Sequence, residues 1–137
     1  MNHQQIFVNL PIKDVARSRA FFASLGYTFN EQFSNDQAFC MVAGENIFVM
    51  MLVEPFFQSF TKKPITDAFK GTEVLTCLSC SSRAEIDELV AKAVAAGGKV
   101  TMPPQDHGFM YGHGYEDLDG HQWEFSYMDM SALPAQP

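Results

Sequence analysis

Four polar side chains in the last third of the sequence are of the types that carry out proton transfer. His107, Tyr111 and His113 occur close together, and Glu124 follows in the stretch His121-Gln122-Trp123-Glu124. A carboxylate among apolar neighbours can act as a general base, and histidine changes its charge near neutral pH. Glu124 and His113 are therefore the candidate catalytic residues. The alternatives are a hydrogen-bonded Glu124 without a catalytic role and loop histidines that are simply solvated.

The three cysteines offer a second possible chemistry. Cys77 and Cys80 form a Cys-x-x-Cys, but no second pair accompanies them, and residues three apart in a strand point to opposite faces. This arrangement favours neither a zinc site nor a redox pair. Cys40 has no evident activating base and is expected either to line a cleft or to fill the core. An odd number of free thiols is typical of a reducing compartment.

Composition narrows the possible partners. The formal charge is −7 and the isoelectric point is about 4.9, without a Lys/Arg cluster. Binding to nucleic acid is therefore not expected, because phosphate contacts need such clusters. No apolar run reaches the roughly 20 residues of a membrane helix, and the N-terminus lacks the features of a signal peptide. We expect no membrane partner and a cytoplasmic location.

The elements that position these residues follow a pattern that begins near the N-terminus. Apolar residues alternate in Ile6–Ile12, which predicts a strand. Asp14 is a suitable helix N-cap, and Gly26 is a suitable stop. Three further strands are expected at Tyr27–Phe29, Ala38–Val42 and Ile47–Val53.

The same order returns in the second half. A strand is expected at Val74–Cys80, and Ser82 with Glu85 forms a capping box at the start of a helix. Gly97-Gly98 ends this helix. The remaining strands are expected at Lys99–Met102, Phe109–Glu116 and His121–Met128, with Trp123, Phe125 and Tyr127 as the better core candidates of the last strand.

Two copies of one pattern indicate an internal duplication. The predicted class is α+β, with two βαβββ modules at about 5–54 and 73–130, joined by a linker at about 55–72. The whole chain, 1–137, is expected to form a single domain. Because each helix covers only one sheet face, the remaining faces are expected to form a shared cleft.

The sequence resembles the glyoxalase/bleomycin-resistance/extradiol-dioxygenase (vicinal oxygen chelate) superfamily. The resemblance rests on Phe7–Asp14 with the following Phe21-Phe22 and Leu25-Gly26-Tyr27, and on Tyr111–Glu124 at the end of the chain. It implies the paired βαβββ fold, but it does not select an activity, because one fold supports many functions.

The resemblance also implies four positions for metal ligands, one on the first and one on the last strand of each half. They fall on Phe7, on Met50 or Met51, on Leu75 and on Glu124. Only Glu124 has a ligand that suits the divalent metals of this family. No cofactor is therefore predicted, and a divalent metal is the alternative.

We interpret the chain as a metal-free member of this superfamily of unassigned activity that binds a small, largely apolar molecule. Whether a reaction follows is left open. The first alternative is a metal-dependent lyase or isomerase like lactoylglutathione lyase, and the second is an antibiotic-sequestering resistance protein. The resemblance also implies a homodimer. The expected ligand-binding residues are Phe7, Asn9, Cys40, Met50, His107, Tyr111 and His113.

Overall fold

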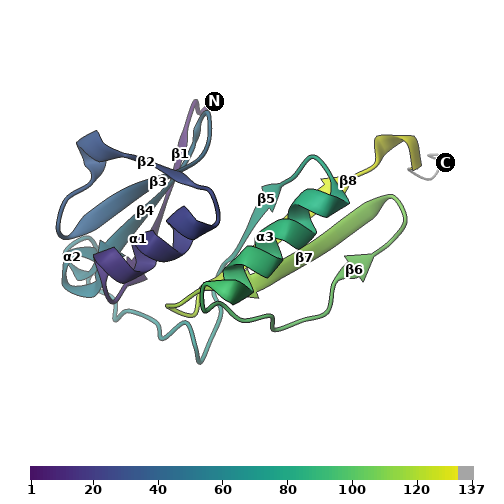
Figure 1. Cartoon of the computed structure of the whole chain (residues 1–137). Coiled ribbons are helices and arrows are strands. Elements are labelled where there is room, and N and C mark those ends of the chain that lie inside the picture. The colour runs from purple at the N-terminus through teal and green to yellow at the C-terminus, as the bar shows by residue number, and fades with distance from the viewer. Residues whose placement is uncertain (133–137) are drawn as a thin grey trace. The chain divides into compact units, whose positions relative to one another are not determined.

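The computed structural model describes residues 1–132, and their contacts divide into two compact units, Met1–Asp67 and a second that begins at Ala68 (Figure 1). The boundary falls within the segment 55–72 that the sequence predicts as a linker. Each unit contains a four-stranded mixed sheet and a helix that covers one face of it. The predicted α+β class with two βαβββ modules is confirmed.

The first unit has its strands in the spatial order β1-β4-β3-β2. Strand β1 pairs with β4 in parallel, and the other neighbours are antiparallel. A 3-10 turn follows β2, and a short helix follows β4. The elements are β1 (Ile6–Ile12), α1 (Val15–Ser24), β2 (Thr28–Asn30), η1 (Glu31–Phe33), β3 (Ala38–Gly44), β4 (Ile47–Val53) and α2 (Glu54–Gln58).

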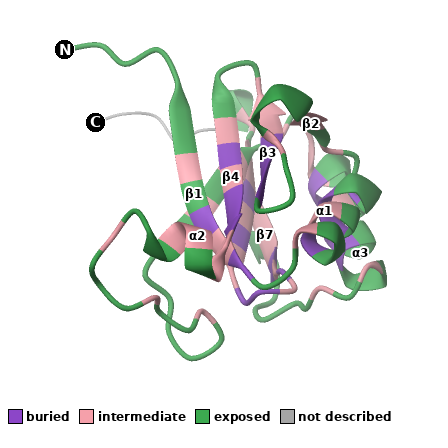
Figure 2. Ribbon diagram, turned by 90° about the vertical axis from the view of Figure 1, so that its left-hand side faces the viewer, coloured by how far each residue is buried: buried purple, intermediate pink, exposed green. Residues whose placement is uncertain are grey.

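Helix α1 begins and ends where the sequence predicts. The Asp14 carboxylate accepts a hydrogen bond from the Arg17 backbone N–H at 2.8 Å, and Gly26 follows the helix with φ +101°, in the region that glycine adopts most easily. Phe21 and Phe22 are buried against the sheet. Figure 2 shows buried stretches on α1 and on strands β3 and β4.

The second unit repeats this arrangement with the strand order β5-β8-β7-β6, in which β5 and β8 are parallel. Helix α3 lies across one face of the sheet (Figure 1). Ser82 caps the helix by accepting a hydrogen bond from the Glu85 N–H at 3.0 Å, as the capping box predicts. The elements are β5 (Leu75–Ser79), α3 (Arg83–Ala95), β6 (Gln105–Asp106), β7 (Met110–Glu116), β8 (Gln122–Met128) and η2 (Met130–Ala132).

One strand prediction was wrong. The sequence predicts a short strand at Lys99–Met102, but only Lys99 makes an isolated bridge, to Glu116. The strand β6 forms later, where Gln105 and Asp106 pair with Gly112 and Tyr111. Five residues, 100–104, thus run beside only three residues of β7, 113–115. The longer segment cannot keep the strand register, so it bows away from the sheet edge.

The core of the second unit lies between α3 and the sheet. Trp123, Phe125 and Tyr115 are buried, and Ile86 and Val90 contribute from the helix. The predicted inward orientation of Trp123 and Phe125 on the last strand is confirmed. Within residues 1–132, no helix is long and apolar enough to span a membrane.

Candidate functional site

The face of the second sheet opposite α3 carries Glu124. In the strand register, Cys77 on β5 and Gly114 on β7 lie directly beside Glu124 on β8. Because side chains alternate along a strand, neighbours two residues away share this face. We call it the open face of the second unit, and it comprises Leu75, Cys77, Ser79, Met110, Gly112, Gly114, Glu116, Gln122, Glu124, Ser126 and Met128.

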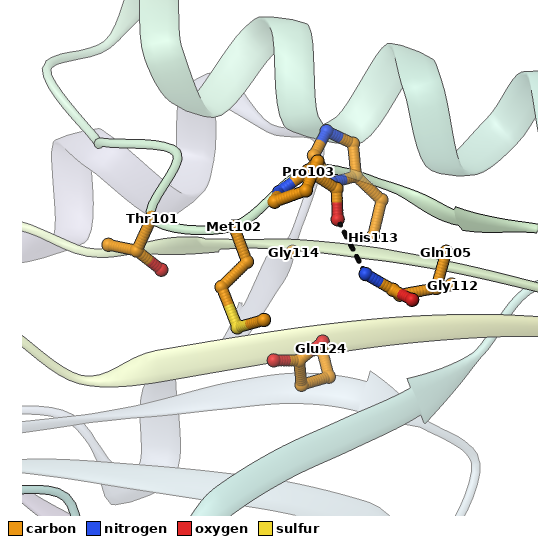
Figure 3. A pocket seen from close by; sticks show the side chains of 8 residues that line it. All are labelled: Thr101, Met102, Pro103, Gln105, Gly112, His113, Gly114 and Glu124. Atoms are coloured by element: carbon orange, nitrogen blue, oxygen red, sulfur yellow. Dashed lines mark hydrogen bonds between the residues drawn. The ribbon is translucent and has the colours of Figure 1, made fainter.

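A pocket of about 50 Å³ opens on this face. The bowed segment 100–104 forms its rim, and strands β7 and β8 form its floor (Figure 3). The volume admits a few water molecules or a small functional group. The lining residues are Thr101, Met102, Pro103, Gln105, Gly112, His113, Gly114 and Glu124.

Two glycines keep the floor of the pocket free of side chains. A Cβ at Gly114 would lie 2.0 Å from the Trp123 carbonyl oxygen, so this position cannot accept a side chain without displacing the backbone. A Cβ at Gly112 would lie 3.6 Å from the Phe125 carbonyl oxygen, an ordinary contact. Glycine at 114 is therefore required by the fold, whereas the fold would accept alanine at 112.

The carboxylate of Glu124 stands beside this bare floor. Glu124 is half-buried and lies in the pocket with Met102 and Gln105 (Figure 3). Among residues 1–132 it has neither a hydrogen-bond partner nor an ion-pair partner. Two carboxylate oxygens are thus available to a ligand.

The other predicted catalytic residue, His113, does not share this face. His113 pairs with Phe125, whose buried side chain lies under α3, and its imidazole points away from Glu124 (Figure 3). The His113 Nδ1 atom is buried and has no hydrogen-bond partner within residues 1–132. Glu124 and His113 were expected in one cleft, but the register of β7 with β8 places them on opposite faces of the sheet.

Tyr111 also lies on the helix face. Its hydroxyl donates a hydrogen bond to the Asp87 carboxylate on α3, at 2.5 Å. That bond, with a smaller effect of burial, raises the pKa of Tyr111 to about 12. His107 is exposed in the connection between β6 and β7, outside the pocket lining. Neither residue therefore lies beside Glu124, although both were expected to bind the ligand.

Arg83 ties the first turn of α3 to the segment that follows the pocket rim. Its guanidinium donates to the Asp106 carboxylate at 2.7 Å and to the Gly108 carbonyl at 2.9 Å, and it lies 5.2 Å from the centre of the Tyr111 ring. The Gly108 N–H and the Arg83 guanidinium together hold the pKa of Asp106 below its usual value. These contacts fix β6, and β6 begins where the rim ends.

The first unit has an open face of its own, and it carries the other expected ligand-binding residues. Asn9 lies between Phe7 and Pro11 on β1 and beside Met50 on β4, while Cys40 on β3 pairs with the same Met50. Phe7 is 46% exposed and its ring stacks on Phe48 at 4.9 Å. Cys40 differs from the others, because it is fully buried and burial raises the pKa of its thiol.

The rim of the pocket and the position of Cys77 were not predicted from the sequence. Thr101, Met102 and Pro103 lie in a segment expected to be a strand or a plain turn, and only the alternating Gly112 and Gly114 hinted at a bare floor. Cys77 is exposed beside Glu124. By contrast, burial raises the pKa of Cys80 to about 11, with a further effect of Glu85.

The four positions that the resemblance assigns to metal ligands do not fit a metal in this chain. The register places Met50, not the buried Met51, on the open face of the first unit. Phe7, Met50 and Leu75 offer a phenyl, a thioether and an isobutyl group, and only Glu124 offers the oxygen that such metals prefer. Residues 1–132 contain no group of three or more His, Cys, Asp or Glu side chains that could hold a metal ion.

Comparison with known proteins shows which fold this chain shares. Residues 4–44 match the family model described as bleomycin resistance protein-like N-terminal. A hypothetical protein from S. aureus is similar over 93% of this chain and 95% of its own, with 28% identity and a TM-score of 0.79. A glyoxalase-related enzyme from Fulvimarina pelagi has 20% identity and a TM-score of 0.75, covering 91% of this chain and 88% of its own.

A third solved structure has the same fold. It is a glyoxalase/bleomycin resistance protein/dioxygenase family enzyme from Burkholderia phytofirmans, with 16% identity, a TM-score of 0.73, and coverage of 89% of this chain and 96% of its own. No curated protein matches the sequence. The fold is that of the vicinal oxygen chelate superfamily. Residues 4–44 are thus similar to the N-terminal part of bleomycin resistance proteins, and the fold is shared with glyoxalase-related structures, as the sequence resemblance indicated.

Proposed function

We propose that this protein binds a small, largely apolar molecule, without a metal ion, with one end of the ligand in the pocket of the second unit. The observation that carries the proposal is the bare floor at Gly112 and Gly114 beneath a rim formed by residues 100–104. A sheet face normally carries a side chain at every second position. Here two adjacent such positions are empty, so the space is available to another molecule.

The size of the pocket indicates how the ligand is held. At about 50 Å³ it is smaller than the roughly 300 Å³ or more of pockets that enclose a whole drug-sized ligand. Only a terminal group fits inside. The rest of the molecule would lie along the open face, where Leu75 is 61% exposed and Met128 is 43% exposed. This apolar surface supports an apolar body for the ligand.

No step of this function passes through a metal ion, because the donor set at the family positions does not fit one. Binding alone accounts for Glu124, because His113, the other candidate catalytic residue, lies on the opposite face of the sheet. We infer in addition that the protein acts as a homodimer, which the resemblance implies, and in the cytoplasm, which suits its three free cysteines.

Substitution of the pocket floor tests the proposal. Gly112→Ala places a methyl group in the pocket, and the fold should gain about 0.5–1 kcal/mol, because alanine loses less backbone entropy than glycine in a strand. Gly71→Ala is the matched control, since a Cβ there meets nothing within 4 Å. A thermal-shift screen over aromatic compounds, thiol adducts and antibiotics should find ligands that stabilise the wild type and Gly71→Ala by mass action.

The same ligands should stabilise Gly112→Ala much less, with at least a tenfold loss of affinity. Equal stabilisation of all three proteins would show that the pocket is not the binding site.

Metal analysis of protein purified without chelator tests the other part of the proposal, that binding needs no metal ion. A divalent metal retained at one equivalent per chain in the wild type, and lost in Glu124→Gln, would show that binding without a metal is wrong.

A further inference from the structure

We infer that the group held in the pocket is a protonated amine, bound by Glu124. This inference rests on the proposed function and adds the chemical class of the ligand. The first observation is the charge of the pocket lining. Glu124 is an acidic residue, and neither lysine nor arginine occurs among the residues that line the pocket. The chain as a whole carries a formal charge of −7, which attracts cations to the molecule over a longer range.

The polar atoms of the lining are largely acceptors. The Thr101 hydroxyl donates to the Gln122 side-chain oxygen at 3.3 Å, so its own oxygen is left with lone pairs only. Gln105 donates an amide N–H to the Pro103 carbonyl at 3.4 Å, and its Oε1 atom stays available. With the two oxygens of Glu124, three side chains from three segments present acceptors around one space (Figure 3).

An ammonium group matches these hydrogen-bond acceptors. It carries three N–H donors and no acceptor, and a hydrogen bond from an ammonium to a carboxylate is roughly twice as strong as one between neutral groups. An anionic end would instead meet the carboxylate of Glu124, and the second amide N–H of Gln105 would be the compensating donor nearest at hand. A divalent cation needs several protein ligands around it, whereas an ammonium needs one carboxylate and neutral acceptors.

The apolar part of the lining suits the carbon atoms next to the nitrogen. The thioether of Met102 and the ring of Pro103 complete the pocket wall, and methionine adapts its shape to alkyl groups. The volume of about 50 Å³ admits a primary amine with its first methylene groups. The ligand is thus expected to be an amphiphilic amine, with its cationic end at Glu124 and its apolar part along the open face.

Three probes of similar shape and different charge test the inference: n-butylammonium, 1-butanol and butyrate. Amide chemical shifts of ¹⁵N-labelled protein are followed in titrations at neutral pH and low salt. Butylammonium should shift the amides of Gly112, Gly114 and Glu124 in a saturable manner. We expect 1-butanol to bind at least tenfold more weakly, and butyrate to leave these amides unchanged.

Glu124→Gln should lower the affinity for butylammonium at least tenfold, to about the affinity for 1-butanol. Glu73→Gln is the control, because Glu73 is an exposed carboxylate of the same unit outside the pocket, and it should leave the affinity unchanged. The Gln variant retains the length of the side chain, so its amide spectrum also shows whether the fold is intact.

The outcomes separate this inference from the proposed function. If 1-butanol binds the wild type as tightly as butylammonium, and Glu124→Gln changes neither, the assignment of an amine is overturned while the pocket stands as an apolar site. If the Gly112 and Gly114 amides respond to none of the probes, and the thermal-shift ligands stabilise Gly112→Ala as well as the wild type, the proposed function itself is overturned.

Discussion

Asp117 accepts hydrogen bonds from three donors at the turn before β8. They are the backbone N–H groups of Asp119 and His121, at 2.9 and 3.0 Å, and the indole N–H of Trp123, at 2.9 Å. Asp117 is only 4% exposed, and burial raises the pKa of its carboxyl, with His121 and these donors acting in the opposite direction. The carboxylate thus joins the turn at Gly120 to the core residue Trp123.

Replacement of Asp117 by alanine should lower the free energy of unfolding by about 3 kcal/mol or more, because each buried donor left without a partner costs about 1–3 kcal/mol. Urea unfolding followed by Trp123 fluorescence measures the change. Asp36→Ala, at an exposed position of the first unit, serves as the control and should change stability by less than about 0.5 kcal/mol. A loss below about 1 kcal/mol for Asp117→Ala would mean that water replaces the carboxylate and that the turn is not a core element.

Single residues also explain why this chain lacks the metal ligands that the resemblance implies. Phe7, Met50 and Leu75 are the wrong chemical types, and each would have to change before Glu124 could become one of several ligands. The strand register shows that Met50 faces outward and that Met51 is buried. The position of the second implied ligand is therefore fixed by the structure as well as by the sequence. The retained Glu124 is then free for another cation, such as an ammonium group.

At the scale of the elements, the position of β6 depends on its connection to α3. Arg83 reaches Asp106 and the Gly108 carbonyl from the first turn of the helix, and the capped end of the helix holds Arg83 in place. The rim segment 100–104 is thereby anchored at its end by side chains and at Lys99 by the bridge to Glu116. Between the two anchors it has no strand partner.

Arg83→Ala should therefore loosen the end of the rim more than it destabilises the whole protein. Exposed ion pairs contribute about 0–1 kcal/mol to global stability, so we expect a small change in unfolding free energy. Amide hydrogen exchange in residues 105–110 should become several-fold faster. Lys92→Ala, which removes the Lys92–Glu88 ion pair on the same helix, should leave this exchange unchanged. Equal exchange in both variants would contradict a role of Arg83 in holding β6.

At the scale of the whole molecule, each unit leaves apolar side chains of its open face exposed. Phe7 and Leu75 are clear examples, one in each unit. Exposure of such surface to water costs about 25 cal/mol for each Å², so a protein that kept both faces uncovered would tend to associate. The homodimer implied by the resemblance provides a defined way to cover apolar surface.

Sedimentation equilibrium tests this prediction. The expected mass is twice the 15.3 kDa of the chain at micromolar concentrations, with no larger species. Dilution should lower the melting temperature, because dissociation and unfolding are linked in a dimer. A mass of one chain up to about 100 μM, a concentration at which even a weak dimer would populate, would show that the homodimer is wrong for this protein.

The sequence by itself determined the elements and the class of fold. Local signals were sufficient for this, because Asp14 and Ser82 cap helices through contacts within one turn, and alternation of apolar residues selects the face that a strand buries. Gly26 and Gly97 both have the positive φ that their predicted role as helix stops requires. The strand bounds were predicted to within one or two residues, except at Lys99–Met102.

The tertiary structure alone decided where the pocket lies. The bow of residues 100–104 arises from an unequal number of residues between two pairings, Lys99 with Glu116 and Gln105 with Gly112, and no local pattern in the sequence specifies this register. Likewise, the faces of His113 and Tyr111 follow from their register with β8, which no local pattern specifies. The sequence gives the type of each side chain, but the pairing of strands decides which side chains lie close together. That pairing is stabilised by the core, which exists only in the folded protein.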